Sequence, residues 1–138
     1  LPRLDVLARV PAPVRFVSLE PLLGPVKLLA WLQTEQMTFD QFSAIFNTPK
    51  VKADTGGNVL SWVIVGAESG HNRRPMETTW VQKIRDDCQA AGVPLFVKQG
   101  SSLWPGKQGQ LPDDLWQVKE MPVIPQEVAD DICPSPTE

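Results

Sequence analysis

Three short apolar runs, each followed by a charged or polar residue, constrain the fold of this chain more than any other feature; they occupy residues 14–20, 62–68 and 94–99. Each run is rich in β-branched or aromatic residues and is bounded by proline or glycine. Such runs are typical of strands that are buried on both faces, as in a parallel sheet. The sequence therefore predicts an α/β fold, either a partial β/α barrel or an open parallel sheet of three to four strands with crossover helices.

The segment between the second and third runs has the pattern of a crossover helix. Thr78 or Thr79 is a suitable N-cap residue, and Gly92 is a suitable C-terminal residue in the left-handed conformation. Apolar residues recur between them at steps of three and four positions, namely Val81, Ile84, Cys88 and Ala91. This spacing predicts a βαβ unit with parallel strands and a right-handed crossover.

Outside this unit the periodicity is weaker but still informative. Leu4 and Leu7 have the spacing of a short helix before the first strand. A further helix is predicted from Thr38, because Phe39, Phe42, Ile45 and Phe46 would share one of its faces. Residues 117–120 are predicted to form a short extended piece after a turn.

These elements predict one domain over residues 1–122, with a variable insertion at about residues 30–58. Prolines and acidic residues favour a disordered tail over residues 123–138. The chain begins at Leu1, within an apparent helix and without an initiator methionine. We therefore expect it to be a fragment or a processed product.

Composition excludes several classes of function. The formal net charge of −3 argues against sequence-independent binding to nucleic acid, which needs lysine and arginine to neutralise phosphates. No apolar stretch approaches the roughly 20 residues that cross a bilayer, so we expect a cytoplasmic protein without a membrane partner. Cys88 and Cys133 are the only cysteines in the sequence. They are too few for a zinc site or an iron-sulfur cluster, and we expect this chain alone to bind no metal and no cofactor.

Charged side chains at the ends of the three predicted strands mark the candidate functional surface. Ligands of parallel α/β folds gather at the carboxyl ends of the strands, where Glu20, Glu68 and Lys98 lie in sequence. The loop after the second strand adds small residues and two guanidinium groups suited to a small anionic ligand. The ligand-binding candidates are Glu20, Gly66, Glu68, Ser69, Arg73, Arg74, Lys98 and Gln99.

A plainer interpretation stays open beside this one. Glu68 would then pair with a nearby arginine or with Lys98, so that the charges only neutralise the strand ends. His71, the sole histidine, is interpreted as a loop residue that faces solvent.

A set of short sequence blocks, each weak alone, forms a specific family pattern when taken together. The blocks cover residues 20–26, 62–70, 74–76, 80, 85–86, 88, 91–94, 96–99 and 112–116. They resemble the carboxyl-terminal half of the phage gene product 37/68 family, a group of uncharacterised phage and prophage proteins. The likeness covers about residues 12–122 in separated blocks. One departure is Gly66-Ala67-Glu68, where the family pattern has Gly-Gly-Glu.

That family resembles radical S-adenosylmethionine enzymes, with a cysteine cluster for an iron-sulfur centre in its amino-terminal half and a partial or full β/α barrel. The resemblance implies that this chain supplies later barrel strands, and that the full-length parent binds S-adenosylmethionine and an iron-sulfur cluster. The cysteine-bearing half has no counterpart in this sequence, and radical chemistry cannot start without the cluster.

Three hypotheses of function follow. The chain is first expected to be part of such a phage or prophage protein, contributing substrate or cofactor contacts but inactive alone. Its partner would then be the missing amino-terminal half or a self-associating copy. The second hypothesis is a non-catalytic α/β module in which the loop at 66–74 binds a nucleotide or another anionic ligand. The third is a protein-interaction scaffold that pairs exposed sheet edges with another chain.

Overall fold

The computed structural model describes residues 2–8, 10, 12, 14–32 and 60–123. Its helices and strands follow in the order α1 (Pro2–Leu7), β1 (Phe16–Leu19), α2 (Leu29–Leu32), β2 (Trp62–Gly66), α4 (Thr78–Ala91), β3 (Leu95–Gln99) and α5 (Asp113–Trp116). The helix predicted from Thr38, most of the predicted insertion and nearly all of the predicted tail lie outside the described residues. Within the described part, no helix is long and apolar enough to cross a membrane.

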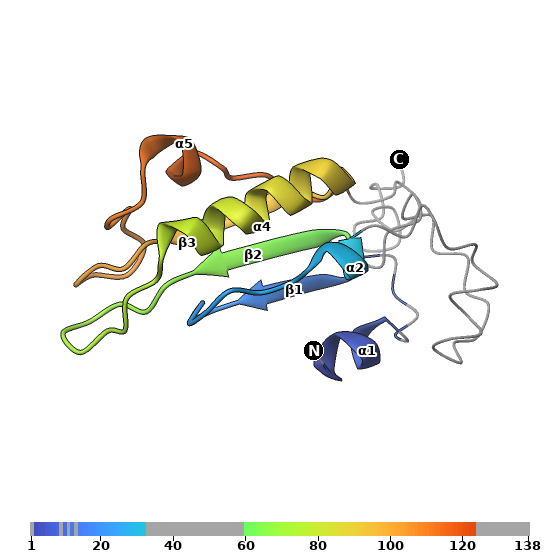
Figure 1. Cartoon of the computed structure of the whole chain (residues 1–138), viewed down its shortest axis with the longest axis horizontal. Helices are drawn as coiled ribbons and strands as arrows, with labels where there is room; N and C mark the ends of the chain where they lie inside the picture. Colours follow the sequence, from blue (N-terminus) through green and yellow to red (C-terminus); the bar gives the residue numbers. More distant parts are fainter. Residues whose placement is uncertain (1, 9, 11, 13, 33–59, 124–138) are drawn as a thin grey trace, which may run out of the picture.

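The three strands form one parallel sheet in the order β1-β2-β3 (Figure 1). Phe16 pairs with Trp62 at the start of the β1–β2 ladder, and Val63 pairs with Leu95 at the start of the β2–β3 ladder. The predicted open parallel sheet with crossover helices is therefore confirmed, with three strands in the described residues. All three strands run toward the same edge of the sheet, which we call the carboxyl edge.

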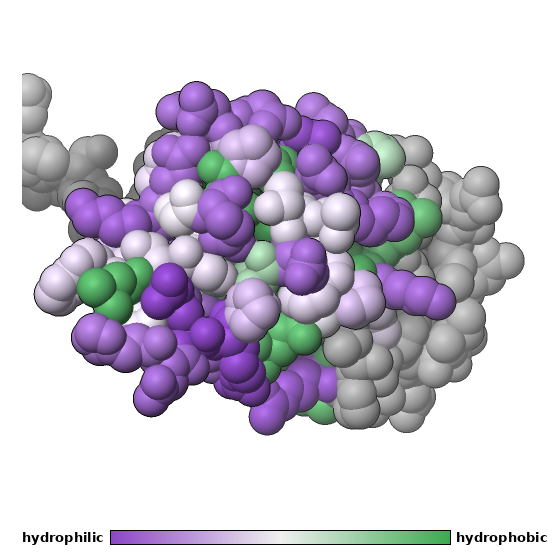
Figure 2. Space-filling model, turned by 60° about the vertical axis from the view of Figure 1, so that its left-hand side comes forward, coloured by the Kyte–Doolittle hydropathy of each residue, from purple (hydrophilic) through white to green (hydrophobic). Residues whose placement is uncertain are grey.

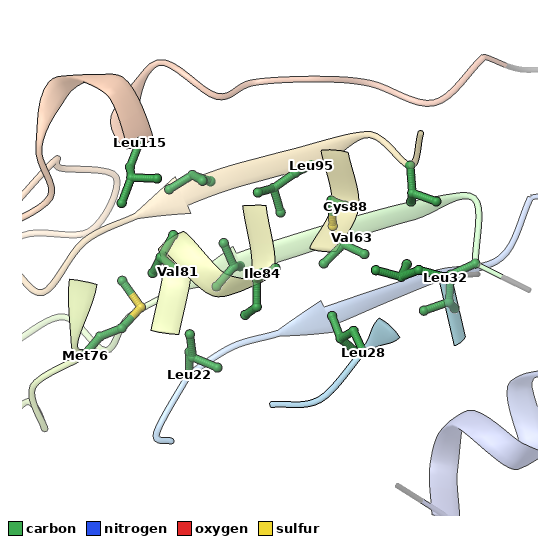
Figure 3. Packing of buried hydrophobic residues seen from close by; sticks show 14 of the residues in the cluster. Leu22, Leu28, Leu32, Val63, Met76, Val81, Ile84, Cys88, Leu95 and Leu115 are labelled. Carbon is green, nitrogen blue, oxygen red and sulfur yellow. The ribbon is translucent and has the colours of Figure 1, made fainter. Parts of the chain in front are cut away.

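One face of the sheet packs against helices. Val63 and Val65 of β2 and Val97 of β3 are fully buried beneath α4, and α2 adjoins α4 on the same side (Figure 3). Burial of each such aliphatic side chain stabilises the fold by about 1.5–3 kcal/mol. This packed layer is the hydrophobic core of the described part of the chain.

The prediction that all three strands are buried on both faces is wrong for β1. Phe16 is 48% exposed, and Ser18 is exposed as well. The reason is that Phe16 and Ser18 lie on the face opposite α4, where Trp62 of β2 and Phe96 of β3 are also only half-buried, and that β1 stands at the end of the strand order. On the face opposite α4, Phe16, Trp62 and Phe96 form a row of aromatic rings, with centroid separations of 5.7 and 6.2 Å.

The crossover helix α4 forms where the sequence predicts it. Val81, Ile84 and Cys88 are buried on one side of it, and Gly92 ends it with φ 64°, the left-handed conformation expected there. The predicted N-cap is wrong by a residue or two, since Glu77 occupies that position in an extended conformation. Its side chain makes no capping hydrogen bond.

The outer edge of β3 is covered by a later segment of the chain. Val97 N–H donates to the carbonyl of Val118 at 2.9 Å, and Glu120 N–H donates to the carbonyl of Leu95 at 2.9 Å. The Glu120 carboxylate also accepts a hydrogen bond from Leu95 N–H at 2.8 Å. The extended piece predicted at 117–120 thus lies antiparallel to β3, with a bridge between Phe96 and Lys119.

Candidate functional site

Glu20 and Lys98 meet at the carboxyl edge of the sheet, although 78 positions separate them in the sequence. Lys98 Nζ lies 2.7 Å from Glu20 Oε2, so their charges compensate each other across the end of β2. Gly66 makes this contact feasible, because a Cβ atom at Gly66 would lie only 3.1 Å from Glu20 Cγ. The other carboxylate oxygen, Glu20 Oε1, is buried and has no hydrogen-bond partner in the structure as described.

Glu68 pairs with Arg74 rather than with Lys98. Arg74 N–H donates to Glu68 Oε2 at 2.8 Å, and Arg74 Nε donates to Glu68 Oε1 at 3.0 Å. The side-chain hydrogen bonds from Arg74 lower the pKa of Glu68 to about 2, and they raise the pKa of Arg74. The Glu68 carboxylate therefore joins the two ends of the loop from Ser69 to Arg73. This pairing with a nearby arginine is the plainer interpretation that the sequence analysis kept beside ligand binding.

The same loop holds Arg73 in a different position. Arg73 donates to the carbonyl of Gly70 at 2.8 Å, and its remaining guanidinium donors lie at an exposed site. Gly70 has φ 107°, a backbone conformation that residues with a side chain rarely adopt. Its N–H donates to the carbonyl of Ser102 at 3.1 Å. Ser69 forms a parallel bridge with Ser102, so it ties two loops together.

Gln99 is also used within the protein. Its Nε2 donates to the carbonyl of Ala67 at 2.6 Å, and its Oε1 accepts from Gly106 N–H at 2.8 Å. Both ends of the amide thereby hold loops at the carboxyl edge.

Beside this edge, at the amino-terminal end of α4, the structure has an open cleft of about 520 Å³. The cleft is lined by His71, Arg73, Pro75, Met76, Glu77, Thr78, Ser101 and Gln110. Figure 2 shows this side of the molecule as a mainly hydrophilic surface with small hydrophobic patches. Of the eight candidates, only Arg73 lines the cleft.

Hydrogen bonds join three of the residues that line the cleft. Met76 N–H donates to Ser101 Oγ at 3.0 Å, and Ser101 N–H donates to Gln110 Oε1 at 2.7 Å. Gln110 Nε2 donates in turn to the carbonyl of Met76 at 2.6 Å. Sequence reasoning missed this group, since its members come from separate loops. The one available signal was the glycine-rich stretch at 100–110, which allows such close packing.

The mouth of the cleft suits an anion better than a cation or an apolar group. The first N–H groups of an α-helix have no acceptor within the helix and carry partial positive charge. Glu77 does not cap them, and Thr78 at the start of α4 faces the cleft. Arg73 adds a full positive charge to the lining, and Glu77 adds a negative one.

Among the described residues, no group of three or more His, Cys, Asp or Glu side chains is placed to hold a metal ion. Cys88 is buried in the core, and burial raises its pKa to about 12, which disfavours the thiolate that binds metal.

Fold and site together define a parallel α/β module with paired charges at the carboxyl edge of its sheet and a polar cleft at the start of α4. The chain belongs to the DUF5131 family, described as a protein of unknown function, whose model matches residues 1–119. Searches among curated proteins and among solved structures gave no match. The resemblance to the phage gene product 37/68 family stays a prediction.

Proposed function

We propose that this chain binds a small phosphate-bearing ligand in the cleft at the start of α4. The observation that carries the proposal is the uncapped amino terminus of a 14-residue helix opening into a cleft that Arg73 also lines. Helix amino termini bind phosphate through their free N–H groups and their dipole, and arginine adds charge-assisted hydrogen bonds. The volume of about 520 Å³ is within the range of small-molecule sites.

The negative charge of Glu77 limits which phosphate-bearing ligands suit the cleft. Glu77 lines the same cleft as Arg73 and Thr78, and a carboxylate only accepts hydrogen bonds. A bare anion gains nothing from it, whereas a ligand with hydroxyl groups beside its phosphate can donate to it. A nucleoside monophosphate or a sugar phosphate meets both requirements.

Titration calorimetry with inorganic phosphate, adenosine monophosphate and adenosine tests this proposal. We expect the monophosphate to bind more tightly than phosphate, and adenosine to give no measurable heat. Arg73→Ala should weaken binding of the monophosphate about tenfold or more, because a charge-assisted hydrogen bond contributes about 1.5–3 kcal/mol.

Arg3→Ala is the matched control, since Arg3 is an exposed arginine on α1 and the substitution removes the same charge. It should leave the affinity unchanged. Equal loss in both variants would mean that only net charge matters, and no binding of any phosphate compound would refute the proposal.

The strand order favours a second candidate function. Consecutive parallel strands with α2 and α4 on one face are the arrangement of neighbouring strands in a β/α barrel. We propose on this ground that the chain can be part of a larger radical S-adenosylmethionine-like protein of phage or prophage origin. The carboxyl-edge residues would there contribute substrate or cofactor contacts, and the cluster would belong to the amino-terminal half.

Anaerobic reconstitution of a longer parent that carries the cysteine motif tests this second candidate. The expected result is a bound iron-sulfur cluster and reductive cleavage of S-adenosylmethionine. A parent that binds neither would exclude it, and that result would leave the anion-binding proposal untouched.

A further inference from the structure

Trp104 is the most exposed of the tryptophans that the structure describes. It is 66% exposed, whereas the other described tryptophans are half-buried, namely Trp31, Trp62, Trp80 and Trp116. Tryptophan is enriched where proteins bind other molecules, because its large ring gains much free energy when it leaves water. A single exposed apolar side chain is nevertheless common on protein surfaces, so the surroundings of Trp104 decide what it can do.

The loop that carries Trp104 is closed at its base by hydrogen bonds. Gly100 N–H donates to the carbonyl of Lys107 at 2.9 Å, and Gly106 N–H donates to Gln99 Oε1 at 2.8 Å. Gly106 has φ 70°, which lets the chain turn back directly after the exposed part of the loop. The loop therefore holds Trp104 in place in the unliganded protein, and a ligand that contacts it pays little conformational entropy to order the backbone.

This loop lies beside the loop that carries His71. Ser69 and Ser102 form a parallel bridge, and Gly70 N–H donates to the carbonyl of Ser102 at 3.1 Å. The two loops thus leave β2 and β3 side by side at the carboxyl edge (Figure 1). Two residues beyond the bridge, one loop reaches His71, which lines the cleft, and the other reaches Trp104. The register of the bridge therefore brings Trp104 to the side of the cleft on which His71 lies.

The position of Trp104 selects among the ligands that suit the cleft. Ser101 of the same loop lines the cleft, but Trp104 is not part of the lining, so a ligand must extend beyond the cleft to reach it. The ribose of a sugar phosphate is attached directly to the phosphate and stays close to Arg73 and the start of α4. The base of a nucleoside monophosphate lies one sugar further out, and its flat ring can stack on an indole.

We propose that Trp104 stacks on the base of a nucleoside monophosphate whose phosphate binds at the start of α4. This inference rests on the proposed function and narrows its two ligand classes to one. Stacking on an aromatic side chain tolerates different bases, because every base has a π face. The selectivity that Trp104 provides is therefore for the presence of a base, and not for one particular base.

Titration calorimetry with adenosine monophosphate and with ribose 5-phosphate tests this inference, because the two compounds differ by the base. We expect the parent chain to bind adenosine monophosphate at least about fivefold more tightly, which is the lower end of what one stacked base contributes. Trp104→Ala should reduce the affinity for adenosine monophosphate to that for ribose 5-phosphate, and it should leave the affinity for ribose 5-phosphate unchanged. Trp104→Phe keeps an aromatic ring and should retain most of the preference.

Met121→Ala is the matched control, since Met121 is 62% exposed and the substitution also removes an exposed apolar side chain. Met121 follows Glu120, whose N–H donates to the carbonyl of Leu95 at the start of β3, so it lies away from the carboxyl edge. This variant should bind both compounds as the parent chain does.

Tryptophan fluorescence supplies a readout that a merely structural role of Trp104 would not change. Adenosine monophosphate should quench the emission of the parent chain, and ribose 5-phosphate should not. Trp104→Phe should bind adenosine monophosphate without this quenching. Quenching that persists in Trp104→Phe would mean that the base stacks elsewhere, and it would overturn the inference.

The calorimetry separates failure of this inference from failure of the proposed function. Equal affinity of the parent chain for the two compounds would overturn the inference and leave phosphate binding intact, as would a preference for adenosine monophosphate that Trp104→Ala retains. If neither compound binds, the proposed function is refuted, and the inference is refuted with it.

Discussion

Arg73 and Arg74 are neighbours in the sequence, but they have separate roles. Arg74 is committed to the Glu68 carboxylate through its backbone N–H and its guanidinium group, whereas Arg73 lies at the cleft. Removing both side chains together would mix a change in loop structure with a change in ligand contacts. The single substitutions separate these two effects.

The Glu68–Arg74 pair should be visible in a pH titration. Its pKa of about 2 is lowered from the ordinary value of 4.5, first by the side-chain hydrogen bond from Arg74. A lowered pKa means that the pair stabilises the fold above about pH 4.5 and that this contribution is lost as the pH falls through about 2.

Carbon-detected NMR of the Glu68 carboxyl group measures this midpoint directly. In Arg74→Ala we expect it to return toward 4.5. An unchanged midpoint in that variant would show that another group lowers the pKa.

The sequence predicted the residue types at the carboxyl edge, but it could not predict their partners. Glu20 and Lys98 were expected at one edge of the sheet, and the structure joins them. Whether Glu68 would pair with Lys98 or with an arginine depends on the course of the loop after β2, which has no periodic pattern. The partners of Gln99 were equally unpredictable. Its amide makes hydrogen bonds to Ala67 and Gly106, whereas the sequence predicted a contact to a ligand.

Among the elements, α4 and its flanking strands were the most predictable, because their apolar residues recur with the periods of a helix and of buried strands. The end of α4 at Gly92 follows from the requirement for a left-handed residue. The start of α4 was not predictable from the sequence. Several adjacent residues can occupy the N-cap position, namely Glu77, Thr78 and Thr79, and tertiary packing decides among them. The exposure of Phe16 and Ser18 on β1 was missed for a related reason, because an apolar run does not reveal which face of the sheet the helices cover.

The loop from Gly100 to Leu111 should be intolerant of even one added methyl group. A Cβ atom at Gly100 would lie 1.9 Å from the backbone oxygen of Gln108, so the two segments cannot keep their contact. We expect Gly100→Ala to lower the free energy of unfolding by about 2 kcal/mol or more in urea denaturation.

Gly24→Ala is the control for that measurement, because a Cβ atom there meets nothing within 4 Å. It should change the free energy of unfolding by less than about 0.5 kcal/mol. Similar stability of the two variants would contradict the close packing of this loop.

At the scale of the whole molecule, the packed layer between the sheet and α4 is the hydrophobic core of the described residues. Cys88 lies within that layer at 1% exposure, which makes its thiol a probe of global opening. Burial, together with the negative charges of Asp87 and Glu120, raises its pKa from 9.0 to about 12. Because the folded state favours the neutral thiol, the resulting contribution to stability is present below about pH 9 and is lost as the pH rises toward 12.

Alkylation of Cys88 at about pH 8 should accordingly be slow in the folded chain, by roughly a hundredfold or more relative to the chain in denaturant. The measurement uses a Cys133→Ser variant, so that only one thiol reacts. Equal rates with and without denaturant would mean that the layer opens far more readily than its burial indicates.

The hydrogen bonds among Met76, Ser101 and Gln110 also have a kinetic consequence for the cleft. Because these hydrogen bonds already join the loops in the unliganded protein, the conformational entropy of the loops is lost during folding and not when a ligand binds. An incoming molecule would immobilise only the few side chains at the entrance. Its rate of association would then be governed by diffusion and orientation, without a slow rearrangement of the backbone.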